Sequence, residues 1–228
     1  MLCDWTERSK KLMGEEGIFK LSQKTVVVLG LGGVGGSCAE ALCRVGIGKL
    51  ILVDSDSFEL TNLNRQVLAT RKVLNMKKCD VAKKRFESIN PDIEITTYTE
   101  FCLPNNSEFI FGCEPDYIAD CIDTITMKIF LAIQCNKRNV NLVSCLGMGN
   151  RCHPESIKLG DIKETIGSGC AVSRIMRQKL KANGISKLDV VYSTEKPAKG
   201  LNPPGSVSFV PPVAGYFAAS KIINDLLL

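Results

Sequence analysis

Four glycines near the start of the chain are the sequence feature with the clearest chemical meaning. They form the pattern G-x-G-x-x-G directly after an apolar run, with one extra glycine inside it: Gly30, Gly32, Gly33 and Gly35. Glycine lets backbone amides approach a phosphate with no Cβ in the way, and a helix starting there directs its positive end at the charge. Asp54, which ends the next apolar run, is placed to accept hydrogen bonds from ribose hydroxyls. These residues predict a nucleotide site, for which NAD and ATP are both suitable at this level.

The elements that must position these residues alternate between strands and helices. Apolar, β-branched runs predict strands, and segments with apolar residues on one face predict helices. In chain order the expected elements are strand 24–30, helix 37–45, strand 49–53, helix 77–89, strand 93–98, strand 116–122, helix 126–137 and strand 141–146. This alternation predicts a doubly wound α/β fold, in which a mostly parallel, Rossmann-like sheet has helices on both faces.

The pattern becomes mixed after residue 150. Short strands are expected at 156–159 and 188–192 on either side of a basic helix at 171–181, and the loop 193–204 is rich in Pro, Lys and Gly. Residues 210–228 predict a buried or docking helix. We expect residues 1–228 to form a single domain. Its nucleotide-binding core is expected at about 22–150, and a substrate-facing C-terminal extension of mixed strands and helices at about 151–228.

Composition indicates the setting in which the protein works. The 228 residues carry a net charge of +5, which suits a partner that bears phosphates. The 11 cysteines include no CxxC pair, so their spacing indicates neither a disulfide framework nor a four-thiolate zinc site. The N-terminus lacks the features of a secretory signal, and Pro, Lys and Asp interrupt the apolar C-terminal segment. We therefore expect a cytoplasmic protein without stable membrane insertion.

Residues 54–66 distinguish between the nucleotide-dependent reactions. Their sequence, DSDSFELTNLNRQ, resembles the adenylating superfamily of sulfur-carrier and ubiquitin-activating enzymes, in which an acidic strand end leads into an S/T-N-L-x-R-Q motif. Adenylate formation must stabilise charge on the α-phosphate and on the departing pyrophosphate. A fixed arginine beside the phosphates therefore favours this chemistry over hydride transfer. The resemblance implies an enzyme that uses ATP and Mg²⁺.

The superfamily's functional residues have counterparts at matching positions of this chain. The resemblance implies that Arg65 and Lys78 contact phosphates, and that Asp123, in a C-x-D-[NST] motif, acts with the nucleotide and is the metal ligand for Mg²⁺. It also implies that Arg8 reaches the phosphates of a partner subunit, so that the protein is a homodimer. The implied catalytic residues are Arg65, Lys78, Asp123 and Arg8. The implied nucleotide-binding residues are Gly30, Gly32, Gly33, Gly35, Asp54, Asp56, Asn62, Arg65, Lys78 and Asp123.

Further motifs connect nearly the whole chain with one branch of this superfamily. The chain resembles the tRNA threonylcarbamoyladenosine dehydratases in GEEG at 14–17, GIG at 46–48, IDTIT at 122–126, SCLGMGN at 144–150, GDIKET at 160–165, VYSTE at 191–195 and GSVSFVP at 205–211. The resemblance implies ATP-dependent dehydration, that is cyclisation, of N6-threonylcarbamoyladenosine in tRNA through an adenylated carboxylate. Because the attacking group belongs to the substrate itself, ring closure needs no nucleophile from the enzyme.

Alternative functions remain open at the level of the sequence. An adenylyltransferase that activates the C-terminus of a ubiquitin-like or sulfur-carrier protein would share the nucleotide site. Its partner would be a sulfur-relay or carrier protein, and Cys170 is a candidate thiol because it begins the basic helix. A nicotinamide-linked oxidoreductase would share the glycine pattern. The basic residues of helix 171–181 and of the loops after it predict salt-sensitive contacts with tRNA phosphates, but an ordinary solvated helix face explains them equally well.

Overall fold

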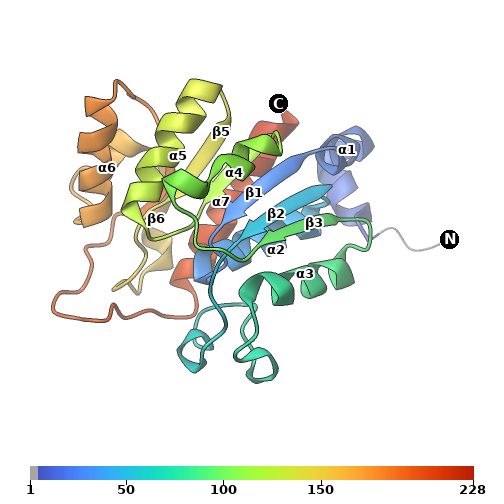
Figure 1. Ribbon diagram of the computed structural model, residues 1–228, viewed down its shortest axis with the longest axis horizontal. Helices are drawn as coiled ribbons and strands as arrows, with labels where there is room; N and C mark the ends of the chain where they lie inside the picture. Colours follow the sequence, from blue (N-terminus) through green and yellow to red (C-terminus); the bar gives the residue numbers. More distant parts are fainter. Residues whose placement is uncertain (1–4) are drawn as a thin grey trace.

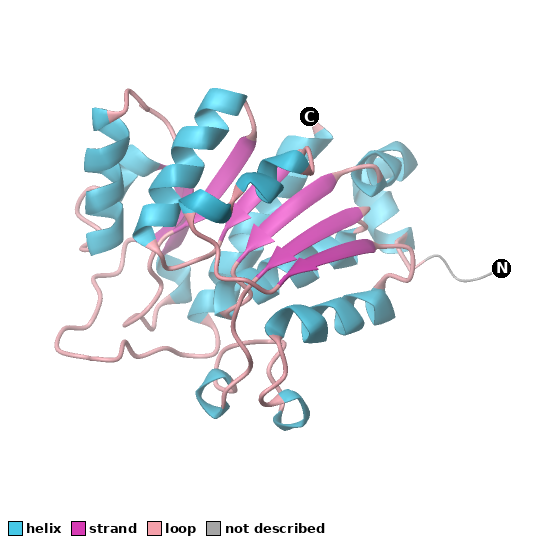
Figure 2. Cartoon of the chain, viewed as in Figure 1, coloured by secondary structure: helices cyan, strands magenta, loops and turns pink. Residues whose placement is uncertain are grey.

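A central sheet with helices on both faces dominates the computed structural model, which describes residues 5–228 (Figures 1 and 2). Within these residues, seven strands form one sheet in the order β3-β2-β1-β4-β5-β7-β6. Neighbouring strands are parallel, except that β6 runs antiparallel to β7. The predicted doubly wound, mostly parallel α/β fold is therefore confirmed. The strands are β1 (Thr25–Leu29), β2 (Lys49–Val53), β3 (Glu94–Tyr98), β4 (Tyr117–Asp120), β5 (Asn141–Cys145), β6 (Ile157–Asp161) and β7 (Asp189–Ser193).

Two helical layers bury opposite faces of the strands. In β1, Val26 and Val28 point into the core beneath α1, α2, α3 and α7, while Val27 and Leu29 point into the core beneath α4, α5 and α6. Successive residues of a strand face opposite sides, so a continuous apolar run is what a doubly covered sheet requires. The helices are α1 (Glu7–Ser22), α2 (Gly33–Val45), α3 (Lys78–Ile89), α4 (Glu108–Gly112), α5 (Ile125–Arg138), α6 (Ala171–Ala182) and α7 (Val210–Leu227).

The C-terminal helix α7 supports the nucleotide-binding half of the sheet. It lies behind the sheet in Figure 1, drawn in red, and packs against α2. A Cβ at Gly215 would overlap the carbonyl oxygen of Val34, so the two helix backbones approach closely because Gly215 has no side chain. The expected C-terminal extension therefore also contributes to the core around the glycine turn. In residues 5–228, no helix combines the length and the apolar character that crossing a bilayer requires.

Helix α1 was not predicted from the sequence. Gly14 interrupts it with a φ of 75° and a ψ of 164°, so two helical stretches meet at a kink. Its buried apolar residues are Ile18 and Leu21, both in the second stretch. A helix with so few buried positions shows no clear apolar periodicity, and the kink divides what periodicity it has.

Candidate nucleotide site

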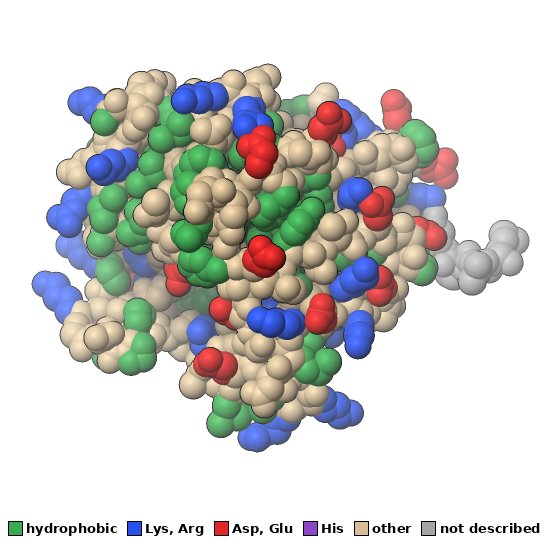
Figure 3. Space-filling view, in the orientation of Figure 1, with side chains coloured by type: hydrophobic (Ala, Val, Ile, Leu, Met, Phe, Trp, Pro, Cys, Tyr) green, Lys and Arg blue, Asp and Glu red, His purple; other side chains and the backbone are tan. Residues whose placement is uncertain are grey.

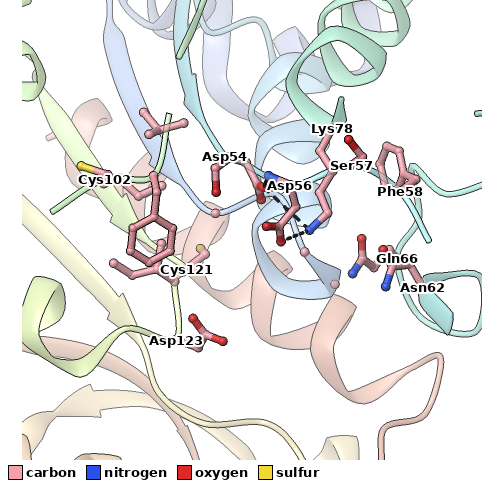
Figure 4. A pocket seen from close by; sticks show the side chains of 18 of the residues that line it. Asp54, Asp56, Ser57, Phe58, Asn62, Gln66, Lys78, Cys102, Cys121 and Asp123 are labelled. Atoms are coloured by element: carbon pink, nitrogen blue, oxygen red, sulfur yellow. Dashed lines mark hydrogen bonds and ion pairs between the residues drawn. The ribbon is translucent and has the colours of Figure 1, made fainter. Parts of the chain in front are cut away.

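An open cavity of about 550 Å³ lies at the carboxyl ends of β1, β2 and β4 (Figure 4). The chain reverses its direction of winding between β1 and β4, and a crevice at such a switch point is where open α/β sheets bind ligands. The cavity lining includes most of the residues that the sequence assigns to the nucleotide: Gly30, Gly32, Gly33, Asp54, Asp56, Asn62, Arg65, Lys78 and Asp123. The remaining residue of that set, Gly35, lies outside the lining and supports the turn from behind.

The glycine turn is tightly packed on its protein side and open on its cavity side. Gly30 has a φ of 84°, a left-handed conformation that residues with a Cβ rarely adopt. A Cβ at Gly35 would overlap the carbonyl oxygen of Gly30, and a Cβ at Gly33 would lie 2.9 Å from a proline side chain of α7. At Gly32 the nearest atom to such a Cβ is Gln66 Nε2, 4.0 Å away. Backbone amides on this open side can therefore be approached by a phosphate.

A buried lysine is fixed between two carboxylates on the wall formed by β2 and α3. Lys78 Nζ lies 2.8 Å from Asp56 Oδ2 and 3.7 Å from Asp54 Oδ1, as Figure 4 shows. Asp54 also accepts hydrogen bonds from the Leu31 N–H at 2.6 Å and from the Asp56 N–H at 2.8 Å. The side chain of Asp54 is 8% exposed, whereas that of Asp56 is 67% exposed. The glycine turn, an acid and a cation are thus connected by short hydrogen bonds and a close ion pair.

The motif after β2 contributes an arginine and two amides to the cavity wall. Asn62 ends the short 3₁₀ helix Leu60–Asn62 and is buried. Arg65 Nη1 donates to the carbonyl oxygen of Thr61 at 2.8 Å and to Asn64 Oδ1 at 2.9 Å, so the guanidinium is held in place. Gln66 is 7% exposed, and its Oε1 is a buried acceptor without a hydrogen-bond partner in residues 5–228. A buried acceptor without a partner is uncommon in folded proteins.

Asp123 lies in a loop and not at a strand end. The expected strand 116–122 would put Asp123 directly at a strand end. The observed β4 ends earlier, at Asp120, which pairs through its carboxylate with Lys128 Nζ at 2.9 Å. Lys128 Nζ also donates to the carbonyl oxygen of Cys145 at 2.7 Å. This fully buried pair joins the ends of β4 and β5. The loop that follows β4 then carries Asp123 into the cavity (Figure 4).

A second cavity of about 400 Å³ adjoins the first. The two cavities share Gly32, Gly33, Arg65, Cys121, Ile122 and Asp123 in their walls. The rest of the second cavity is lined by residues 145–149, at and after the end of β5, by residues 203–206, before α7, and by Val34, Lys128, Val172 and Pro211. Chemical groups that occupy the two cavities would therefore meet beside Arg65 and Asp123.

Sequence reasoning missed several residues of the first cavity. Gln66 belongs to the motif quoted above, so that motif was the signal for it. Phe101 and Cys102 follow β3, and the rule that carboxyl ends of parallel strands face the ligand could have identified them. The missed lining residues also include Ser55, Ser57, Phe58, Glu59, Asn75, Glu100 and Thr124.

Arg8 does not line the cavity of its own chain. It is an exposed residue near the start of α1, so it can act on a nucleotide only in a neighbouring subunit. Its catalytic role stays a prediction. For metal binding, residues 5–228 contain no group of three or more His, Cys, Asp or Glu side chains arranged around one ion. A metal that binds here must take most of its ligands from elsewhere.

Comparison with known proteins agrees with this geometry. The profile of the ThiF family matches residues 6–227. The chain belongs to the ThiF family. One ThiF-family relative is the tRNA threonylcarbamoyladenosine dehydratase of Bacillus subtilis (strain 168). It is 36% identical in an alignment that covers 96% of this chain and 93% of the relative. The resemblance noted in the sequence motifs is confirmed.

Solved structures show the same ThiF-family fold over the full length. Crystal structures of E. coli tRNA N6-threonylcarbamoyladenosine dehydratase, TcdA, cover 100% of this chain and this chain covers 97% of theirs. The complex with ATP has a TM-score of 0.92 at 29% identity, and the complex with AMP has a TM-score of 0.91 at 30% identity. The chain therefore has the architecture of an enzyme that is known with both nucleotides bound.

Proposed function

We propose that this chain is an ATP-dependent tRNA threonylcarbamoyladenosine dehydratase that cyclises N6-threonylcarbamoyladenosine in tRNA. The observation that carries the proposal is the pair of adjoining cavities with Arg65 and Asp123 in their shared wall. The first has the glycine turn of a nucleotide site, and the second provides space for a group to be activated. Full-length similarity to the B. subtilis and E. coli dehydratases supports this substrate over a carrier protein.

ATP suits the residues of the first cavity. The open side of the glycine turn can offer amides to the phosphates, and Arg65 and Lys78 supply positive charge beside them. Asp54 is assigned to the ribose, and Asp56 and Asn62 complete the proposed binding set.

Adenylation activates the threonyl carboxylate of the modified base. A carboxylate oxygen attacks the α-phosphorus of ATP, a P–O bond forms, and pyrophosphate leaves. An atom of the carbamoyl group then attacks the carbonyl carbon, the ring closes, and AMP departs with the oxygen that belonged to the carboxylate. Arg65 and Lys78 would stabilise the charge that develops on the phosphates. Ring closure benefits from high effective molarity because its nucleophile is tethered to the electrophile.

Mg²⁺ fits as a companion of ATP. Such an ion usually keeps several waters and binds through one or two carboxylates together with the substrate phosphates. Asp123 supplies a carboxylate in the cavity lining, which is consistent with the absence of a larger ligand cluster in residues 5–228. When bound, the ion would neutralise charge on the phosphates.

A basic edge of the molecule is the proposed contact for tRNA. Because the proposed substrate is tRNA, we also propose that the enzyme is cytoplasmic. Figure 3 shows Lys and Arg side chains along the edge where α6 and the loop before α7 lie. The exposed basic residues of this region include Arg174, Lys179, Lys181, Lys187, Lys196 and Lys199. If these residues bind phosphates, the affinity for tRNA falls steeply as salt increases.

Nucleoside mass spectrometry tests the proposal directly. The wild-type protein, ATP and Mg²⁺ are incubated with tRNA that carries uncyclised threonylcarbamoyladenosine, and the nucleosides are measured after digestion. We expect loss of one water from this nucleoside, with AMP formed in equal amount. Arg65→Ala should abolish turnover, whereas Arg71→Ala, a matched change at an exposed arginine outside both cavities, should not. AMP formation that responds to a small diglycine-ended protein but not to this tRNA would favour the carrier-protein alternative.

A further inference from the structure

The loop between β7 and α7 forms one wall of the second cavity. We call residues 194–206 of this loop the flap. The flap contains no helix or strand, and Figure 1 shows it extending outward beside β6 and α6. Its last residues, 203–206, line the second cavity together with residues 147–149, and a Cβ at Gly149 would lie 3.1 Å from the Pro204 side chain. The position of this wall therefore depends on the hydrogen bonds that the flap makes with the rest of the protein.

Asn150 forms hydrogen bonds with both arms of the flap, the arm that leaves β7 and the arm that leads into α7. Its backbone N–H donates to the carbonyl oxygen of Gly205 at 2.8 Å, and its carbonyl oxygen accepts from the Ala198 N–H at 2.8 Å. The side-chain Oδ1 accepts from the Gly205 N–H at 2.6 Å. Asn150 has a φ of 60°, in the left-handed region that asparagine adopts more readily than most residues. The side chain of Asn150 thus binds the arm of the flap that leads into α7 and lines the cavity.

Asn64 connects the same arm to the phosphate-facing arginine. Its Nδ2 donates to the carbonyl oxygen of Ser206 at 3.0 Å, and its Oδ1 accepts from Arg65 Nη1 at 2.9 Å. The two ends of one amide therefore hold the flap and the guanidinium. Because Gly205 and Ser206 are consecutive, Asn150 and Asn64 fix adjacent points of the flap from two different elements.

We propose that Asn150 and Asn64 are positioning residues for the acceptor, that is, the carboxylate group that receives AMP from ATP. They hold the flap wall at a set distance from Arg65, so that a carboxylate in the second cavity faces the nucleotide in the first. The identity of this acceptor rests on the function proposed above. Reacting groups must be held within a narrow range of geometry, and a displacement of about 1 Å at a distant support can slow a reaction by about 100-fold.

Three substitutions separate the hydrogen bonds from other effects. Asn150→Gly keeps a residue that accepts the left-handed backbone and removes only the side-chain acceptor, while Asn150→Asp restores an acceptor. Asn64→Asp keeps the acceptor for Arg65 but removes the donor to the flap. Asn139→Gly is the matched control, because Asn139 is an exposed residue with a φ of 55° at the C-terminus of α5, outside both cavities.

Two measurements report on the flap. Trypsin cleavage after Lys199, in the folded protein without substrate, should be about three- to tenfold faster in Asn150→Gly and Asn64→Asp, as expected from one lost hydrogen bond. The KM for tRNA should rise by a similar factor in both variants, while the affinity of Asn150→Gly for ATP stays at the wild-type value. Asn150→Asp and Asn139→Gly should behave like the wild-type protein in both measurements.

The outcomes distinguish this proposal from the proposed function. Wild-type cleavage rates and an unchanged KM in both Asn150→Gly and Asn64→Asp would overturn the positioning role. If no form of the protein, including the wild type, acts on tRNA, the proposed function fails. Faster cleavage in the two variants would still support the role of Asn150 and Asn64, because that measurement needs no substrate.

Discussion

Replacing Gly32 with alanine should weaken ATP binding without unfolding the protein. A Cβ at this position meets no atom closer than Gln66 Nε2 at 4.0 Å, and the backbone is already extended, with a φ of −70°. We expect the free energy of unfolding to change by no more than about 1 kcal/mol, the usual cost of exchanging Gly and Ala at a compatible site. The new methyl group instead projects into the cavity. It displaces the phosphate that the turn is proposed to hold.

The loss of affinity follows from the hydrogen bonds that the displaced phosphate gives up. Each amide hydrogen bond to a charged group contributes about 1.5–3 kcal/mol, so the loss of one raises the Kd for ATP by about 10- to 150-fold. Gly35→Ala provides the contrast. A Cβ there would lie 1.7 Å from the carbonyl oxygen of Gly30. This oxygen belongs to the backbone of the tight turn and cannot move aside as a flexible side chain could. Overpacking typically costs about 1–3 kcal/mol, and an overlap with backbone this severe puts Gly35→Ala at or above the upper end of that range.

Calorimetry and thermal unfolding check both expectations. For a chain of this length 1 kcal/mol corresponds to about 2–4 °C in Tm, so Gly32→Ala should melt within about 4 °C of the wild type and Gly35→Ala at least about 6–12 °C lower. Titration with ATP should show weak binding by Gly32→Ala despite its intact fold. Wild-type affinity in Gly32→Ala would refute the assignment of the phosphates to this turn. A wild-type Tm in Gly35→Ala would refute the packing argument.

Three further perturbations test the packing, the electrostatics and the assembly. Lys128→Met should lower the free energy of unfolding by about 3–5 kcal/mol in chemical denaturation, because it leaves a buried carboxylate unpaired. Burial raises the pKa of Glu40, but hydrogen bonds from two arginines, Arg85 foremost, hold it below the usual 4.5. The Tm advantage of the wild type over Glu40→Gln should therefore be full above pH 4.5 and disappear as pH falls through the lower folded-state pKa. If Arg8 acts across a dimer, mixing inactive Arg8→Ala and Arg65→Ala chains should restore about a quarter of the activity, since half of the exchanged dimers contain one intact site.

The nucleotide-binding half of the fold could be predicted because its signals are local. The strand β1 is apolar from Val26 to Leu29, the glycines follow it directly, and Asp54 comes directly after the next strand. Neighbouring residues therefore already specify strand, turn and helix. Arg65 and Lys78 came from a motif and its resemblance to a family, and the structure brings both to one cavity. Their exact hydrogen-bond partners were not deducible, because these depend on how the segment between β2 and α3 folds.

The second cavity and its flap could not be predicted in the same way, because the residues that form their contacts are far apart in the sequence. The side chain of Asn150 meets Gly205 at a separation of 55 residues, and Asn64 meets Ser206 at a separation of 142. No periodicity reports such pairs, and the flap has no regular structure of its own. The order of strands beyond β5 was equally hidden, since β7 pairs with β5 before β6 joins the edge of the sheet.

The thiols that line the two cavities favour direct ring closure over a thioester intermediate. Burial raises the pKa of Cys102 to about 11. The pKa of Cys145 is raised by its contact with Cys121 and by burial. For Cys121 the Cys145 contact lowers the pKa, but the Cys38 thiol and burial outweigh it, and the net shift is upward. Because the thiolate is the reactive form, these three cysteines are poor nucleophiles at neutral pH.

Cys170, outside the linings of the two cavities, has a thiol whose pKa is shifted in the opposite direction. Burial raises the pKa of Cys170, but backbone N–H groups of Ser173 and Gly147 outweigh it and hold the pKa below its ordinary value. Cys170 does not line either of the two adjoining cavities, although a Cβ at Gly147, which lines the second, would lie 3.6 Å from its sulfur. The shared wall therefore offers an adenylated carboxylate cations and amides but no thiolate. This arrangement suits the proposed cyclisation, in which the tethered carbamoyl group of the substrate supplies the attacking atom.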